Sequence, residues 1–106
     1  MSLRGGTTRQ SIKKYHVYLV TNYSNDIIYT GVTNNIIRRI YEHKNKLIEG
    51  FTQKYNVNKL VCFEEYSDSK DALNREKQIK AGSRQDKINL IVKDNPEFYD
   101  LYNQLI

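Results

Sequence analysis

The sequence predicts a small α+β domain in which an antiparallel hairpin and one further strand are covered by helices. Segments 15–21 and 27–32 are rich in β-branched and aromatic residues, and the turn-forming run Asn-Tyr-Ser-Asn-Asp separates them, as in a hairpin. Segment 59–66 has the same character and predicts a third strand. Most other segments after the hairpin place apolar residues at helical spacing, which predicts the covering helices.

The first helix is predicted over about 35–48. Thr33, Asn34 or Asn35 can cap its start, and Glu49-Gly50 can end it. On a helical wheel, one apolar face holds Ile36, Ile37, Ile40 and Leu47.

Two further helices are predicted near the C-terminus. Ser83 with Asp86 three residues later has the pattern of a helix start, so a third helix covers roughly 84–92. Asn95-Pro96 breaks the chain and starts a fourth helix. The apolar stripe of this last helix would be Phe98, Leu101, Tyr102 and Leu105.

The length of 106 residues suits one domain. The first residues are polar and contain a glycine pair, so we expect a disordered leader at 1–14. The folded domain is expected at 15–93, with the C-terminal helix at 94–106 packed on it.

Composition limits the possible partners. A net charge of +5 and a pI near 9.3 indicate an anionic partner, commonly nucleic acid, although a surface selected for solubility gives the same excess. No apolar run is long enough to cross a membrane. One cysteine suits a reducing cytoplasm, and with only two histidines the chain cannot build a four-ligand zinc site. Any metal would therefore be held by oxygen, as Mg²⁺ and Mn²⁺ prefer.

A few polar residues are candidates for chemistry. Arg39 and His43 lie four residues apart on one flank of the first helix, so their side chains are neighbours. Tyr18 and Tyr29 fall on the two arms of the hairpin, close enough to face one another. Taken singly, each residue is better explained by packing or solvation than by catalysis. A tyrosine acting as a base at neutral pH would need a nearby cation, because its ordinary pKa is about 10.

The second helix, capped by Ser67-Asp68-Ser69 and reaching about Lys80, carries an anomalous carboxylate. Glu76 falls near the middle of its apolar stripe, which consists of Ala72, Leu73 and Ile79. A buried carboxylate must be paired, protonated or bound to metal. Either Lys80, four residues on, forms an ordinary helix pair with Glu76, or Glu76 lines a cleft and holds a cation.

Taken together, these residues resemble the GIY-YIG nuclease family. The first motif is His16-Val17-Tyr18 and the second is Tyr29-Thr30-Gly31. The phrase at 33–43 is similar to the family helix with its arginine and histidine, and the phrase at 72–80 to the helix with its glutamate. The resemblance covers roughly 15–91. The chain looks most like the small single-domain bacterial members, and it also resembles the catalytic domain of the nuclease subunit of excision repair.

The resemblance implies a three-stranded antiparallel sheet flanked by helices, and hydrolysis of a phosphodiester with one divalent ion, Mg²⁺ or Mn²⁺. It implies that Glu76 binds the metal and that Arg39 stabilises the extra negative charge of the transition state. Tyr18 would activate or position the attacking water, with Tyr29 assisting from the adjacent strand. His43 would lie near the scissile phosphate as a proton carrier or an orienting group.

This sequence departs from the family pattern at two positions. His16 replaces the glycine of the first motif, which we expect to be tolerated if its side chain points outward and to crowd the hairpin if it does not. Val32 stands after Gly31 where many members carry a lysine, so one positive charge is missing. Gly31 itself would allow the start of the first helix to pack against the strand.

The prediction is a metal-dependent endonuclease acting on nucleic acid, with DNA favoured and RNA not excluded. The alternatives are an inactive nucleic-acid-binding module of the same fold and a protein-interaction domain with incidental positive charge. Contacts to the phosphate backbone are predicted for Arg38, Lys46, Arg75, Lys77, Lys80, Arg84 and Lys87.

Overall fold

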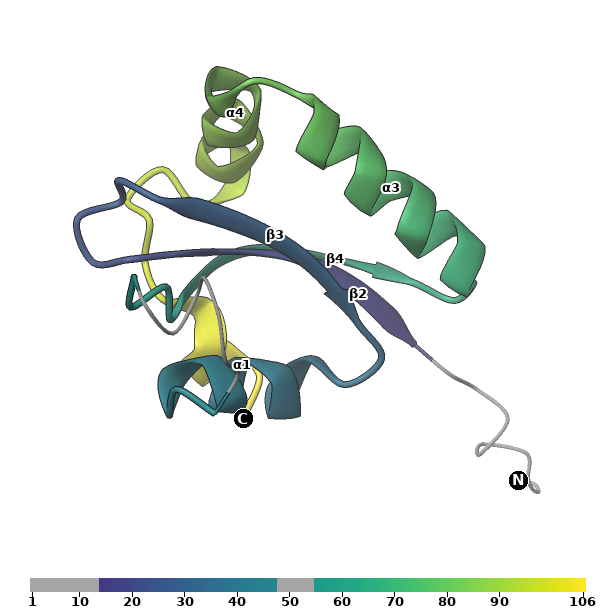
Figure 1. The fold of residues 1–106 in the computed structure, drawn as a ribbon, viewed down its shortest axis with the longest axis horizontal. Helices are drawn as coiled ribbons and strands as arrows, with labels where there is room; N and C mark the ends of the chain where they lie inside the picture. The colour runs from purple at the N-terminus through teal and green to yellow at the C-terminus, as the bar shows by residue number, and fades with distance from the viewer. Residues whose placement is uncertain (1–13, 48–54) are drawn as a thin grey trace.

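A computed structural model describes residues 14–47 and 55–106 (Figure 1). The elements follow one another as β2 (Tyr15–Thr21), β3 (Ile28–Thr33), α1 (Ile36–Lys44), β4 (Lys59–Tyr66), α3 (Ser69–Ala81), α4 (Arg84–Asp94) and the 3₁₀ helix η2 (Leu101–Gln104). Within these residues no helix is both long and apolar enough to cross a membrane. The expected leader at 1–14 lies outside the described residues except for its last residue.

The three strands form one antiparallel sheet in the order β3-β2-β4, which confirms the predicted fold class. β2 is the central strand and pairs with both neighbours. Its ladder with β4 shifts register between Leu19 and Val20. The turn at 22–26 is closed by the Asn22 side chain, whose oxygen accepts from the backbone N–H groups of Asp26 and Ile27.

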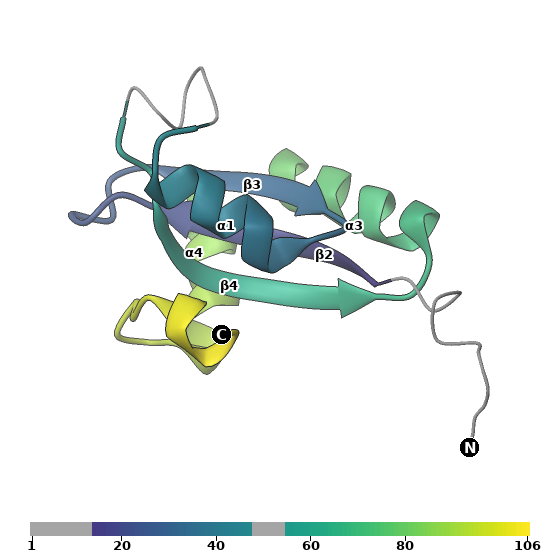
Figure 2. The ribbon, with the colours of Figure 1, turned by 90° about the horizontal axis from the view of Figure 1, so that it is seen from below.

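Each face of the sheet is covered by helices, and alternation along β2 supplies both cores (Figure 1). α3 and α4 cover one face, where the buried residues are Val17, Leu19, Val61, Ala72, Ile79 and Ile91. α1 lies on the other face, and Figure 2 shows η2 beyond β4 at the opposite edge from β3. Buried on the α1 face are Tyr18, Val20, Ile36, Ile40, Val57 and Leu60. Tyr18 therefore belongs to the α1 face of the sheet.

Local capping explains where the helices begin. The Asn35 side chain accepts from the N–H of Arg38 at the start of α1, and Asp68 caps α3 by accepting from Lys70. Ser83 and Asp86 form a reciprocal capping box at the start of α4, as their spacing predicts. Each cap satisfies backbone donors that have no partner inside the helix.

The predicted apolar face of the first helix is partly wrong. α1 ends at Lys44, and both Ile37 and Leu47 are exposed, the latter with 62% of its surface accessible. Lys46 has a φ of 56°, a left-handed backbone that stops the helix before Leu47 can join its buried stripe. The predicted helix end at 49–50 lies outside the described residues.

The fourth predicted helix also differs from expectation. The chain does not continue as a helix from Pro96, because Phe98 has a φ of 55° and only the short η2 follows. Leu101, Tyr102 and Leu105 pack on the α1 face, whereas Phe98 packs against the core under α3 and α4. The C-terminal segment therefore contributes to both cores instead of presenting one stripe.

Candidate functional site

Tyr18 lies at the centre of the candidate site, directly across the β2–β3 ladder from Gly31. Its ring occupies the space above this glycine. A Cβ atom added to Gly31 would lie 2.5 Å from the Tyr18 hydroxyl oxygen and 2.6 Å from Cζ. Gly31 is thus required for room beside the Tyr18 ring, rather than for the packing of the helix start that was expected.

The Tyr18 hydroxyl meets a histidine from α1. Tyr18 Oη and His43 Nε2 lie 3.1 Å apart in a buried hydrogen bond. Tyr29 is opposite Val20, two residues from Gly31 on the same face of β3, and its ring centroid is 6.0 Å from that of His43. The two tyrosines do not face one another directly, and His43 is the side chain that both contact.

The pKa values at this pair fix where the proton resides. Burial, reinforced by the positive charge of Arg39, lowers the pKa of His43 to about 4, so its imidazole is neutral at pH 7. Burial also raises the pKa of Tyr18 well above its ordinary range, with a smaller contribution from Tyr29. Tyr18 is therefore a protonated phenol beside a neutral His43, and the tautomer of the imidazole decides which of the two donates the hydrogen bond.

Three charged side chains also act on the Tyr18 hydroxyl. Arg39 lowers the pKa of Tyr18, whereas Glu42 and Glu76 raise it. Arg39 and Glu42 come from α1, and Glu76 comes from α3 on the other side of the sheet. α3 runs beside the edge strand β3, as the two views agree (Figures 1 and 2), which is how a carboxylate from the opposite layer acts on this hydroxyl.

Glu42 is a member of this cluster that the sequence argument did not identify. Its carboxylate lies 3.9 Å from Nε of Arg39 and 3.9 Å from Nε of Arg38. The signal was present, because Glu42 is three residues after Arg39 and four after Arg38, the spacings of helical ion pairs. In the free protein the Arg39 guanidinium therefore has a carboxylate beside it.

Glu76 forms the ion pair that its spacing predicts. Lys80 Nζ lies 2.6 Å from Oε2 of Glu76, and the Glu76 side chain is only 13% exposed. Its neighbours on the expected stripe differ from one another, since Ala72 and Ile79 are buried and Leu73 is exposed. The carboxylate therefore lies on the flank of the buried stripe rather than at its middle.

The donor set fits a divalent ion that substrate helps to hold. No group of three or more His, Cys, Asp and Glu side chains that could bind a metal occurs in residues 14–47 and 55–106. Glu76 offers one carboxylate of low exposure, and its charge contributes to raising the pKa of Tyr18. Mg²⁺ is commonly bound through one or two carboxylates, several waters and substrate phosphate, and one carboxylate meets that requirement.

His16 departs from its expected orientation. It shares the α1 face of the sheet with Tyr18, and its side chain is mostly buried against the ring of Phe63. Its Nε2 atom lies 3.5 Å from Oε1 of Glu65, the residue across the β2–β4 ladder. His16 thus does not point outward, the orientation in which we expected the replacement of glycine to be tolerated, because residues two apart on a strand share a face.

The predicted phosphate contacts do not gather on one surface. Arg38 and Lys46 belong to α1 or its end, on the face opposite α3 and α4. Arg75 is bound through Nε and Nη2 to Glu64, and Lys87 donates to the Gly82 carbonyl. These contacts leave the prediction untested but show that several of the cations already have partners within the fold.

Arg84 has a structural partner as well. Its guanidinium donates to the backbone carbonyls of Asn25 and Asp26, which ties the start of α4 to the β2–β3 turn. Lys77 and Lys80 remain on α3, both exposed, and Lys80 is next to Glu76. Lys80 is therefore in direct contact with a candidate catalytic residue.

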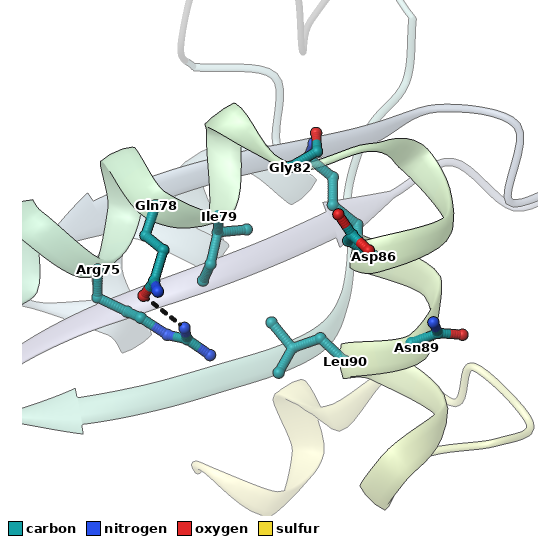
Figure 3. Close-up of a pocket in the computed structure, with 8 residues that line it drawn as sticks. Arg75, Gln78, Ile79, Gly82, Asp86, Asn89 and Leu90 are labelled. Atoms are coloured by element: carbon teal, nitrogen blue, oxygen red, sulfur yellow. Dashed lines mark hydrogen bonds between the residues drawn. The ribbon is translucent and has the colours of Figure 1, made fainter.

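A hollow of about 390 Å³ lies between α3 and α4 rather than beside Tyr18 (Figure 3). Figure 3 shows Arg75 and Gln78 joined by a hydrogen bond along its α3 wall. Leu90 and Asp86 line the α4 side. Arg75 is three helical positions from Gln78 and faces β4, whereas Glu76 is on the β3 side of α3, so the hollow is separate from the candidate site.

Comparisons with known proteins identify the family of this chain. The GIY-YIG catalytic domain matches residues 14–89. The chain belongs to the GIY-YIG family. It is similar to the UPF0213 protein of Syntrophus aciditrophicus (strain SB), 39% identical over 87 residues that cover 81% of this chain and 98% of the relative. A UPF0213 protein of Clostridium perfringens is 36% identical over 76 residues, covering 72% of this chain and 81% of that protein.

A solved structure has the same fold. The solution NMR structure of a UPF0213 protein from Bacillus halodurans matches with a TM-score of 0.53 and 23% identity. The match covers 82% of this chain and 92% of the other. At this identity the likeness establishes the shared α+β architecture.

Proposed function

We propose that this protein is a metal-dependent endonuclease that hydrolyses phosphodiester bonds in nucleic acid, with DNA favoured as the substrate. One observation carries the proposal. The Tyr18 hydroxyl is hydrogen-bonded to a neutral His43 and is acted on by Arg39, Glu42 and Glu76, which come from both layers of helices. Membership of a family defined by this catalytic domain supports the same conclusion.

The proton path follows from the hydrogen bond. Because the pKa of Tyr18 is raised, its phenol does not ionise by itself at neutral pH. As a water attacks the phosphorus atom, its proton passes to Tyr18 Oη while the phenol proton passes to Nε2 of His43. His43 becomes an imidazolium while the bond from phosphorus to the leaving oxygen breaks. The leaving oxygen takes up a proton from solvent, and His43 returns its extra proton to solvent through Tyr18, which restores the neutral pair.

Arg39 and Glu76 are the residues that stabilise the negative charge of the transition state. Arg39 donates to a non-bridging phosphate oxygen as negative charge builds on it, an interaction suited to a fixed planar cation. Glu76 would hold the divalent ion, which would supply Lewis-acid chemistry at the phosphate. Tyr29 contacts the His43 ring and helps to keep it oriented toward Tyr18.

A binding module of the same fold with little turnover is the second candidate function. Val32 supports this second candidate. Many members of the family carry a lysine at this position, so this chain lacks a positive charge that would contribute to catalysis. The ion pair between Glu76 and Lys80 supports it as well, since a paired carboxylate is less available to a metal.

A cleavage assay on a mixed panel distinguishes the two candidates. The panel contains single-stranded, duplex and branched DNA and structured RNA, incubated with Mg²⁺ or Mn²⁺ and with EDTA. The endonuclease predicts cutting that requires the metal and is abolished in Glu76→Ala. Cutting that persists in Glu76→Ala would show a contaminant and remove this site assignment. Salt-sensitive binding without cutting of any substrate would support the binding module.

A further inference from the structure

The ion pair at Glu76 is unusual in how unequally its two members are exposed. The Glu76 side chain is 13% exposed, whereas that of Lys80 is 51% exposed. The ammonium thus covers the carboxylate from the solvent side at a distance of 2.6 Å. Any cation that reaches Glu76 from solvent must compete with an ammonium that is already there.

The competition between Lys80 and a divalent ion for Glu76 determines whether the metal binds before or after a phosphate. An ammonium and a hydrated divalent ion both gain from the same carboxylate, and a single carboxylate with waters holds Mg²⁺ weakly. A phosphate changes the balance, because its oxygens complete the shell of the metal and at the same time offer the ammonium a new anionic partner.

We propose that Lys80 is the built-in counter-ion of Glu76, which keeps divalent metal off this carboxylate until a phosphate arrives and accepts the displaced ammonium. The inference rests on the proposed function, because it assumes that Glu76 holds the metal. It assigns to Lys80 a role that a surface contact with the phosphate backbone does not include.

The chain offers a matched control on the same helix. Lys77 is exposed, and within the described residues it forms no ion pair. Lys77→Gln removes the same charge as Lys80→Gln, but it leaves the partner of Glu76 in place. Lys80→Arg keeps a cation at the position and tests whether charge, rather than the lysine itself, is what matters.

The test is a titration of the free protein with Mn²⁺, without nucleic acid, followed by the electron paramagnetic resonance signal of free Mn²⁺. We expect Lys80→Gln to bind Mn²⁺ more tightly than Lys77→Gln by about two- to five-fold, the range that exposed and partly exposed ion pairs contribute. Lys80→Arg should bind as weakly as the unaltered protein, and Glu76→Gln should lose the binding. Circular dichroism spectra establish that each variant is folded.

The outcomes separate this inference from the proposed function. Equal affinities in Lys80→Gln and Lys77→Gln, with binding lost in Glu76→Gln, would overturn the counter-ion role and leave Glu76 as the metal ligand. Undiminished Mn²⁺ binding in Glu76→Gln would instead overturn the metal site itself.

Discussion

Replacing Gly31 with alanine is predicted to displace Tyr18 from its hydrogen bond. The added Cβ would lie 2.5 Å from Oη and 2.6 Å from Cζ of Tyr18, closer than real Cβ contacts. Tyr18 is 2% exposed, so its ring has no free space to move into. The backbone of Gly31 adds no strain of its own, because its φ is not in the left-handed region.

The size of the effect follows from two contributions. Overpacking of a dense core costs about 1–3 kcal/mol, and loss of one buried hydrogen bond, here the 3.1 Å bond to His43, costs about 1 kcal/mol more. We therefore expect Gly31→Ala to lower the free energy of unfolding by about 2–4 kcal/mol. Urea denaturation at pH 7 measures this change.

Two comparisons make the result specific. At Gly82 a Cβ would lie 3.1 Å from Oδ2 of Asp86, and the φ of −77° suits alanine, so Gly82→Ala should change stability by less than about 1 kcal/mol. In a Tyr18→Ala background the ring is gone, and Gly31→Ala should then cost little. An equal cost of Gly31→Ala in both backgrounds would refute the reasoning.

Three further predictions follow from the same contacts. Tyr18→Phe keeps the ring but leaves His43 Nε2 buried without a partner, so the protein should lose about 1–3 kcal/mol in urea denaturation and cleavage should slow by about 10²–10⁴-fold. The pKa of His43 is about 4 when folded and 6.5 ordinarily, so the unfolded state binds more protons between these values and stability decreases as the pH is lowered from 6.5 towards 4. Unfolding at pH 7 and pH 5 should differ by about 2 kcal/mol, and His43→Gln should reduce that difference. Asn95→Ala removes hydrogen bonds with the backbone of Val61 and Tyr99, and should lower the thermal midpoint by about 4–8 °C for each kcal/mol lost.

Much of the fold could be predicted because its signals are local. Strand patterns and turn residues defined the hairpin, and the Ser83–Asp86 spacing defined the start of α4. Helix ends were less predictable, since the left-handed backbone at Lys46 and Phe98 has no clear signal in residue type. These two positions explain why Leu47 and Phe98 are not on their expected stripes.

Neighbours along a single helix could be predicted from the sequence, whereas contacts between the helices and the sheet could not. Spacing along the helices placed Arg39 beside His43 and Lys80 beside Glu76, and both relationships are present in the structure. The hydrogen bond from Tyr18 to His43 depends on how α1 packs on the sheet, which residue spacing alone does not determine.

Two other features depended on the strand register. It places Gly31, not Tyr29, opposite Tyr18. It also turns His16 onto the same face as Tyr18, contrary to expectation.

The single-turnover rate of nucleic-acid cleavage with Mg²⁺ tests the central claim most directly, when Glu76→Gln is compared with Asp71→Asn. Both variants remove one carboxylate from α3, but Asp71 is exposed in the first turn of the helix, away from Tyr18. The account predicts that Asp71→Asn cleaves at the rate of the unaltered protein and that Glu76→Gln is slower by at least about 10²-fold. Equal rates in the two variants would contradict a catalytic site at Glu76.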